Sequence, residues 1–192
     1  MLRSLTDGSL TGFDCGPGNA LLDYWCHKNT GAPFDNGGAW AARGDVNTGL
    51  LEILLAEPYF KKAPPKSTGR DLFNPDWLER KLAGFETVQA VDVQATLTEL
   101  TAVSCARSAP PTCETLVMCG GGAFNLSLLA RLRHWLPTCQ IQTSDQFGLP
   151  PLQVEATAFA WLAKMAVEGK VASDASVTGA SGARILGAIY QA

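Results

Sequence analysis

Apolar residues recur at three- and four-residue intervals in several stretches of the chain, and this spacing places them on one face of a helix. Residues 18–28 carry two leucines, a tryptophan and a cysteine at such intervals. A later apolar stretch stops at Pro58, because proline cannot continue a helix. Asn74-Pro75 combines a capping residue with a first-turn proline. We therefore predict helices over residues 18–28, 48–57 and 93–106, and one that begins at Asn74 with Leu78 and Leu82 on its apolar face.

The last third of the chain alternates segments typical of strands with segments typical of helices. Residues 115–119 (TLVMC) form a short apolar run, and residues 139–143 (CQIQT) alternate like a half-buried strand. A helix is predicted between them, over residues 125–136. Residues 152–168 are apolar nearly all round and are closed by Gly169, which predicts a buried helix with a glycine C-cap. The alternation indicates an α/β domain.

Composition excludes several classes of protein. The 192 residues include 15 basic and 18 acidic side chains, so the net charge of −3 argues against a nucleic-acid groove and against nucleic-acid partners. The 46% hydrophobic and 17% charged content argues against general disorder. No run of about 18 apolar residues is present, so we expect no membrane span. The first residues, MLRSLTDGSLTGFD, lack an apolar stretch, so we expect no secretory signal.

The cysteines do not predict a metal site. No CxxC pair occurs, and the chain has two histidines. A zinc site would need closely spaced ligands. We interpret the cysteines as reduced thiols that act as small hydrophobic core residues in a cytoplasmic protein. The six are Cys15, Cys26, Cys105, Cys113, Cys119 and Cys139.

The segment GFDCGPGN, residues 12–19, could carry catalytic chemistry. A strand-like stretch delivers Asp14 to a turn containing Gly16 and Gly18, which opens the helix predicted over 18–28. Glycines let backbone N–H groups approach an anion, and a helix N-terminus favours negative charge. Asp14 would then be a general base for a nucleophile that attacks a phosphoryl or glycosyl centre. The alternative is a tight turn in which Asp14 caps the helix. The residue pattern by itself slightly favours the cap, because short glycine motifs are common.

Two further segments have both a functional and a structural interpretation. Gly120, Gly121 and Gly122 join a predicted strand to a helix. They would let a flat ligand or a phosphate lie against the backbone, or would simply allow close packing of strand on helix. The basic loop Lys66–Asp71 could meet a phosphate or a carboxylate through Arg70, or be an ordinary solvated loop.

Glu155 is the acidic residue near the start of the predicted helix 152–168. Phe159, Leu162 and Ala166 share its face. A carboxylate on an apolar face must be paired, be protonated or line a cleft. In the first helical turn it would instead reach solvent and favour the helix dipole. Both interpretations remain open.

Taken together, the motifs resemble those of the anhydro-N-acetylmuramic acid kinase family. The segments are, in order, GFDCGPGNALLDYW, FDNGGAWAARG, PKSTGRDLFN, QATLTELTA, CGGGAFN, EATAFAWLA and SVTGASGARILGAIY. They cover nearly the whole chain, from about Gly12 to Tyr190. Cys15 stands where the family usually has Thr. The match is to the C-terminal half of such kinases.

The resemblance implies a fold, a reaction and a set of site residues. The fold is a lobe of the actin-like and hexokinase-like (ribonuclease H-like) ATPases, an α/β domain with a mixed sheet flanked by helices. The reaction uses ATP and Mg²⁺ to phosphorylate O6 of the 1,6-anhydro sugar while water opens the anhydro bond, in cytoplasmic recycling of peptidoglycan. Asp14 matches the general base and Glu155 a sugar-contacting acid. Gly16, Gly18, Gly120, Gly121 and Gly122 match glycines that face ATP.

Length is the main departure from the family. Two lobes are expected, and residues 1–192 supply one domain corresponding to the second, so the missing N-terminal lobe is an expected partner. We expect it to dock near residues 12–40 and 120–122, and the family's habit also makes a homodimer compatible with the sequence. The alternatives to a kinase lobe are a non-catalytic sugar- or nucleotide-binding domain and a truncated remnant.

Overall fold

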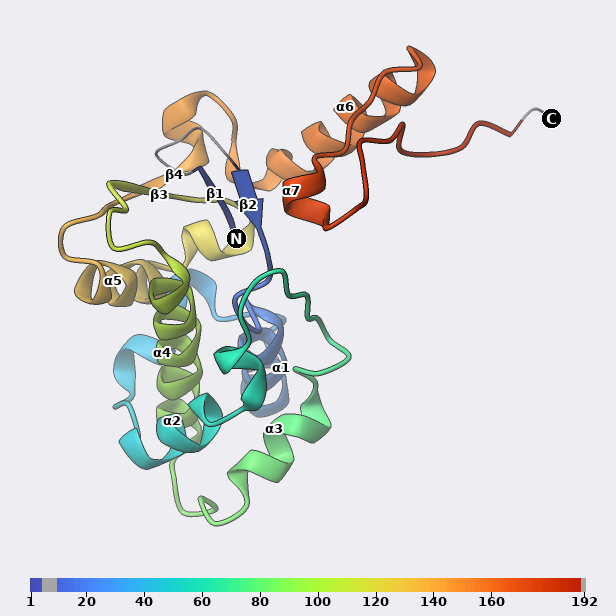
Figure 1. Ribbon diagram of the computed structural model, residues 1–192. Helices are drawn as coiled ribbons and strands as arrows, with labels where there is room; N and C mark the ends of the chain where they lie inside the picture. The colour runs from blue at the N-terminus through green and yellow to red at the C-terminus, as the bar shows by residue number, and fades with distance from the viewer. Residues whose placement is uncertain (5–9, 191–192) are drawn as a thin grey trace.

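The computed structural model describes residues 1–4 and 10–190, and it is mostly helical (Figure 1). The described chain has two short N-terminal strands, a helical body, a strand–helix–strand unit and a C-terminal helical segment. The strands are β1 (Leu2–Ser4), β2 (Leu10–Gly12), β3 (Thr115–Met118) and β4 (Gln140–Thr143). The helices are α1 (Ala20–Thr30), α2 (Thr48–Leu55), α3 (Pro75–Leu82), α4 (Ala90–Ser108), α5 (Leu126–Trp135), α6 (Val154–Val167) and the short α7 (Ala175–Thr178).

Asparagine side chains cap the N-termini of three of the helices. Asn74 accepts a hydrogen bond from the backbone N–H of Trp77 at 2.9 Å, with Pro75 as the first helical residue of α3. Asn47 and Asn125 accept equivalent bonds at the starts of α2 and α5. Each bond satisfies a backbone donor that has no partner within the helix. The predicted start of α3 is therefore confirmed, and so are the other helices predicted in the first two thirds of the chain.

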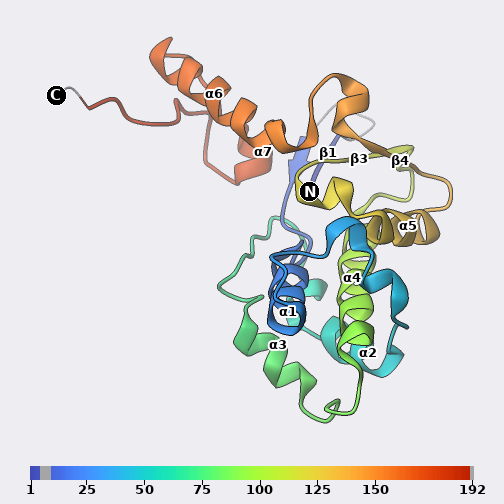
Figure 2. The same cartoon turned by 180° about the vertical axis from the view of Figure 1, so that it is seen from behind.

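Helix α4 is the centre of the helical body (Figures 1 and 2). It contacts α1, α2 and α5, and residues 93–100 are buried on all sides. Its buried threonines are accommodated because their hydroxyls donate to carbonyls one turn earlier, as Thr98 does to Gln94 at 3.0 Å. The sequence predicts this helix but not its complete burial, since its polar residues suggest a solvated face.

A buried carboxylate ties α4 to α5. Glu99, which is 3% exposed, accepts hydrogen bonds at Oε1 from Arg131 Nη2 and from Trp135 Nε1, each at 2.8 Å. Arg131 Nε donates to the other carboxylate oxygen. The Glu99 carboxylate raises the pKa of the Arg131 guanidinium. The buried charge of Glu99 is tolerated because N–H donors of Arg131 and Trp135 hydrogen-bond to both carboxylate oxygens.

Removing the partner should therefore destabilise the fold. We expect Arg131→Met to lower the free energy of unfolding by about 3 kcal/mol, because it leaves Glu99 buried with one N–H donor. The matched control is Lys28→Met, which removes the cation of the exposed Lys28–Glu79 pair and should cost less than about 1 kcal/mol. Urea denaturation of both variants measures the difference. Equal effects would show that the Glu99 network contributes no more than a surface ion pair.

The strands form two separate two-stranded sheets. β3 and β4 are parallel, with Leu116 opposite Ile141, and α5 connects them. β1 and β2 are antiparallel, with Arg3 opposite Thr11. The α/β class is confirmed, but within the described residues no single mixed sheet exists, so that part of the prediction is wrong. A core of α5 leucines and Ile141 fills the space between α5 and the parallel pair.

Helix α6 does not have the buried environment that its sequence predicts. Although apolar nearly all round, it has no buried residue, and it projects away from the helical body (Figure 1). Phe159 is 64% exposed and Trp161 49%. Gly169 does close the helix, because its φ of +64° is left-handed and the N–H of Lys170 donates to Met165 O at 2.8 Å. The predicted burial of this helix is therefore wrong, because no side chain of α6 is buried by the described residues.

The described residues contain no helix whose length and apolar character would let it cross a membrane.

Candidate functional site

Asp14 is held in place by hydrogen bonds to one neighbouring loop and to one tyrosine. Its backbone N–H donates to Lys66 O at 3.2 Å, and its carbonyl accepts from the Tyr59 hydroxyl at 2.6 Å. Ser67 Oγ and the N–H of Thr68 both donate to Asp14 Oδ2 at 3.0 Å. No described residue donates to the other carboxylate oxygen. That oxygen is therefore free to accept a proton from a ligand.

This arrangement excludes the cap interpretation of Asp14. The N-cap of α1 is Asn19, and the Asp14 carboxylate bonds to residues 67 and 68 instead of the helix. It also excludes the interpretation of the Lys66–Asp71 loop as merely solvated. Burial, followed by the charge of Asp14, raises the pKa of Tyr59 to about 12, so Tyr59 remains a hydrogen-bond donor at neutral pH. The contact between this loop and Asp14 could not be predicted from the sequence, because more than 50 residues separate the two segments.

The first glycine turn packs tightly against α4. A Cβ added to Gly16 would lie 2.6 Å from Ser104 Oγ, which leaves no room for a side chain. Gly18 has a φ of +57°, a conformation that favours glycine. Both residues are thus required by backbone geometry, whatever they bind.

The second glycine segment lies opposite the first. Gly120 has a φ of +69°, and a 3-10 helix over Gly121–Phe124 follows it. A Cβ on Gly121 would lie 3.3 Å from Asn19 Nδ2. The side chain of Asn19, the last residue of GPGN, therefore faces the backbone of the second segment.

The two segments enclose a cavity of about 380 Å³. Asp14 is the carboxylate among its described lining residues. Thr101, Ser104 and Leu128 also line it, from α4 and α5. The structure thus brings together six of the seven predicted site residues: Asp14, Gly16, Gly18, Gly120, Gly121 and Gly122.

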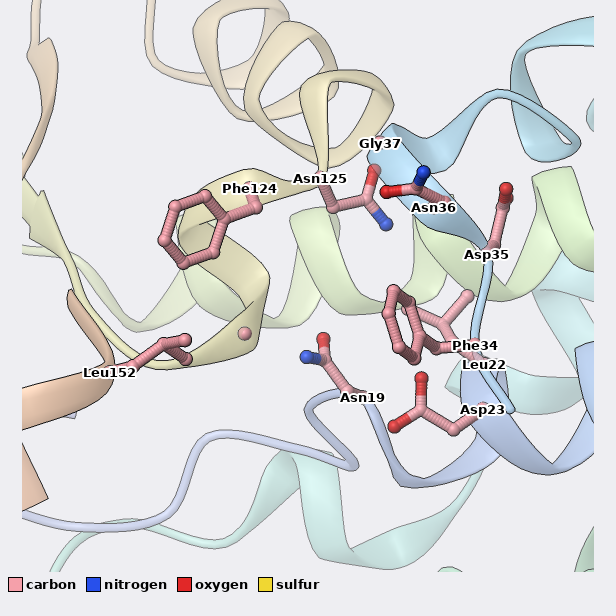
Figure 3. A pocket seen from close by; sticks show the side chains of 11 residues that line it. Asn19, Leu22, Asp23, Phe34, Asp35, Asn36, Gly37, Phe124, Asn125 and Leu152 are labelled. Carbon is pink, nitrogen blue, oxygen red and sulfur yellow. The ribbon is translucent and has the colours of Figure 1, made fainter. Parts of the chain in front are cut away.

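A second cavity of about 480 Å³ adjoins the first and shares Asn19 and Gly121 with it. Figure 3 shows Phe34 and Phe124 on opposite sides of this cavity, with Asn19 between them and Asn125, the residue that precedes α5, above them. The two phenylalanines are 54% and 52% exposed. Burial raises the pKa of Asp23, another lining residue, although the charge of Arg70 opposes the shift. Phe34 and Phe124 were not predicted from the sequence, although both flank glycine-rich motifs.

Glu155 lies apart from these cavities. It is exposed in the first turn of α6 and lines neither of them. Leu152, three residues earlier, does line the second cavity, so the start of α6 lies near it.

The cysteines are less uniform than predicted. All six are free thiols, but only Cys26 and Cys139 are buried, and Cys119 is exposed. Cys15 and Cys105 line the first cavity, and Cys105 also packs against the core beside α5. Among the described residues, no three His, Cys, Asp or Glu side chains cluster closely enough to hold a metal ion.

Facing glycine segments beside a fixed carboxylate are what a phosphate-binding enzyme site requires. The family model for anhydro-N-acetylmuramic acid kinase matches residues 4–192, so the chain belongs to this family. Family membership implies a fold of the actin-like ATPase type.

Curated relatives carry the same description. The chain is 59% identical to the anhydro-N-acetylmuramic acid kinase of Albidiferax ferrireducens, with 94% of the chain and 47% of the relative aligned. It is 56% identical to that of Variovorax paradoxus, with 96% and 50% aligned. For Cupriavidus metallidurans the identity is 51%, also with 96% and 50% aligned. The chain therefore spans about half the length of the curated relatives it matches.

Proposed function

We propose that this chain is the second lobe of an anhydro-N-acetylmuramic acid kinase. The complete enzyme would convert the 1,6-anhydro sugar, ATP and water into N-acetylmuramic acid 6-phosphate and ADP, during peptidoglycan recycling in the bacterial cytoplasm. One observation carries the proposal: Asp14 is held by the 66–68 loop at the mouth of a cavity lined by two glycine segments.

In this mechanism Asp14 is the general base. Ser67 and Thr68 hold Oδ2, which leaves the other oxygen to accept a proton from the attacking water. The water oxygen then bonds to the anomeric carbon as the anhydro C–O bond breaks, and the released O6 takes the phosphoryl group. The role of the 66–68 loop is positioning: it fixes the carboxylate before the substrate binds.

The two adjoining cavities fit the parts of a nucleotide. Backbone groups of the glycine segments line the first cavity, where a phosphate chain can approach them closely. The second cavity offers two aromatic faces for a flat base. We place the phosphates in the first cavity and the base in the second, with Asn19 and Gly121 at the junction.

The residues also fit Mg²⁺ that arrives with the nucleotide. Mg²⁺ is usually bound by one or two carboxylates together with phosphates and water. Because Asp14, the carboxylate at the first cavity, is assigned to the proton of the water, the phosphates and water would supply the ligands of Mg²⁺. Its contribution when bound would be to neutralise charge on the phosphates.

The missing half of the enzyme offers the simplest partner for α6. Phe159 and Trp161 of α6 are large exposed apolar side chains, and such surface marks an interaction site. Phe34, Phe124 and Leu152 expose further apolar surface beside the cavities, in keeping with docking near residues 12–40 and 120–122. We propose that the first lobe covers both surfaces, and that a homodimer is the alternative partner. Glu155 would then contact the sugar at the junction of the lobes.

Nucleotide binding by this chain tests the placement of the base. We expect Phe34→Ala to weaken ADP binding about 5- to 150-fold, because stacking on one aromatic ring contributes about 1–3 kcal/mol. Isothermal titration calorimetry with ADP and Mg²⁺ measures the dissociation constant. Phe147→Ala is the matched control, since Phe147 is similarly exposed, at 61% against 54% for Phe34, but lines neither cavity. If both variants bind ADP as the parent chain does, the base does not lie beside Phe34.

A further inference from the structure

A third cavity, of about 450 Å³, adjoins the first cavity and shares Cys15 and Ser104 with it. Its volume lies in the range of about 300–1,000 Å³ that is usual for small-molecule sites. Four basic side chains line it, and its described lining residues include no carboxylate. The four are Lys61, Lys62, Lys66 and Arg107. The cavity therefore concentrates positive charge in a chain whose net charge is −3.

These four cations have no counter-charge from the described part of the chain. No described acidic side chain forms an ion pair with any of them, whereas other basic residues, such as Arg131 and Lys28, are paired. Four like charges that line one cavity repel one another unless an anion lies between them. The arrangement is therefore suited to an anion that comes from outside the chain.

Tyr59 holds two of the ammonium groups in place. The centroid of its ring lies 4.9 Å from Lys66 Nζ and 5.8 Å from Lys62 Nζ, within the range of cation–π attraction. The ring is itself fixed, because the Tyr59 hydroxyl donates to Asp14 O at 2.6 Å. Two of the cations are thus ordered before a ligand binds, which lowers the entropic cost of binding.

The third cavity differs from the first in the way it would recognise an anion. The described lining of the first cavity contains glycine segments and no Lys or Arg, whereas that of the third contains four basic side chains and no glycine. Phe60, Pro110 and Pro111 add apolar surface to the third cavity. An anion in it would therefore be bound by side-chain charge, with an apolar wall against its carbon skeleton.

We propose that the third cavity binds a compact organic anion with two or more negative charges, either a phosphate ester or a polycarboxylate. The guanidinium of Arg107 has the geometry for two parallel bonds to an oxyanion, and the lysines add point charges. The anion would lie beside the loop that fixes Asp14, because the Lys66 carbonyl accepts the Asp14 N–H at 3.2 Å. The site does not depend on the nucleotide proposal, which uses the other two cavities.

The experiment is isothermal titration calorimetry of the 192-residue chain at low ionic strength, with glucose 6-phosphate, citrate and glucose as separate probes. We expect at least one of the two anions to bind, and neutral glucose not to bind. The double variant Lys62→Gln/Arg107→Gln should weaken anion binding at least about tenfold, because it removes two charge-assisted contacts. Added salt should also weaken binding, because it screens partly exposed charges.

The matched control is the double variant Lys164→Gln/Lys170→Gln. It removes the same number of positive charges, from exposed side chains in and just after α6 that line none of the three cavities. We expect this variant to bind the anion as the parent chain does. Thermal melting of both double variants checks that they fold.

Four results would overturn the proposal. Neither anion could bind, or glucose could bind as tightly as the anions. An anion could bind Lys62→Gln/Arg107→Gln as tightly as the parent, which would place it elsewhere, for example at the glycine segments. The two double variants could also lose affinity equally, which would reduce the effect to net charge. Because no nucleotide or anhydro sugar is present, none of these results bears on the kinase assignment.

Discussion

In a complete kinase that contains this lobe, Asp14→Asn is expected to lower turnover by about 10²- to 10⁴-fold, the usual contribution of a general base. Asn keeps the size of the side chain and can still accept the bonds from Ser67 and Thr68 at its oxygen. It cannot take a proton from water. Affinity for ATP should change little, because the glycine segments are unaltered. A coupled assay of ADP release gives turnover, and thermal melting checks that the variant folds.

The control for this variant is Asp76→Asn in the first turn of α3. Asp76 is exposed and lines neither cavity, so turnover should remain at the parent value. Near-normal turnover in Asp14→Asn would mean that Asp14 only anchors the 66–68 loop and that another group accepts the proton.

The second large effect concerns this chain by itself. We expect its turnover on ATP and the anhydro sugar to lie at least about 10³-fold below that of an ordinary kinase, because phosphoryl transfer depends on groups positioned on both sides of the reacting centre. Under the proposed assignment, the described residues supply one side of that arrangement. ADP release that depends on the sugar is the measurement.

A matched background control is needed for so slow a rate. The chain carrying Asp14→Asn should give the same residual ADP release as the parent chain, which would assign that release to contaminating enzymes. Sugar-dependent turnover of about 1–100 per second from the parent chain would show that one lobe suffices.

Local signals in the sequence predicted the helices well. The Asn-Pro start of α3 is a short-range hydrogen-bond pattern, so four residues contain the information. The strand–glycine–helix order around β3 and α5 is local in the same sense. Such features do not depend on distant packing, and for that reason they could be predicted without a structure.

Features that depend on distant contacts could not be predicted in this way. The burial of α4 on all sides depends on α1, α2 and α5, which pack around it. Its threonines are polar, so the sequence pattern predicts a solvated face at positions that are in fact buried. The exposure of α6 is the opposite case, because its apolar pattern predicts burial and none of its side chains is buried by the described residues.

The candidate site shows the same division. The glycine motifs and Asp14 were named from the sequence as candidates, since glycine turns have a recognisable pattern, and the structure places them around one cavity. Their roles stay predictions. The attachment of Asp14 to Ser67 and Thr68 was missed because it joins segments 53 and 54 positions apart. Cys15 and Cys105 were both interpreted as core residues, and their place in the lining of the first cavity was missed for the same reason.

The central claim is that this chain is one lobe of a two-lobed kinase. Its most direct test is the rate of sugar-dependent ADP release when this chain is mixed with the half of the Albidiferax ferrireducens kinase that it does not match. The account predicts release from the mixture that exceeds the sum of the separate halves by at least about 10³-fold, and that Asp14→Asn abolishes this gain. A mixture that binds together and releases ADP no faster than its separate halves would contradict it.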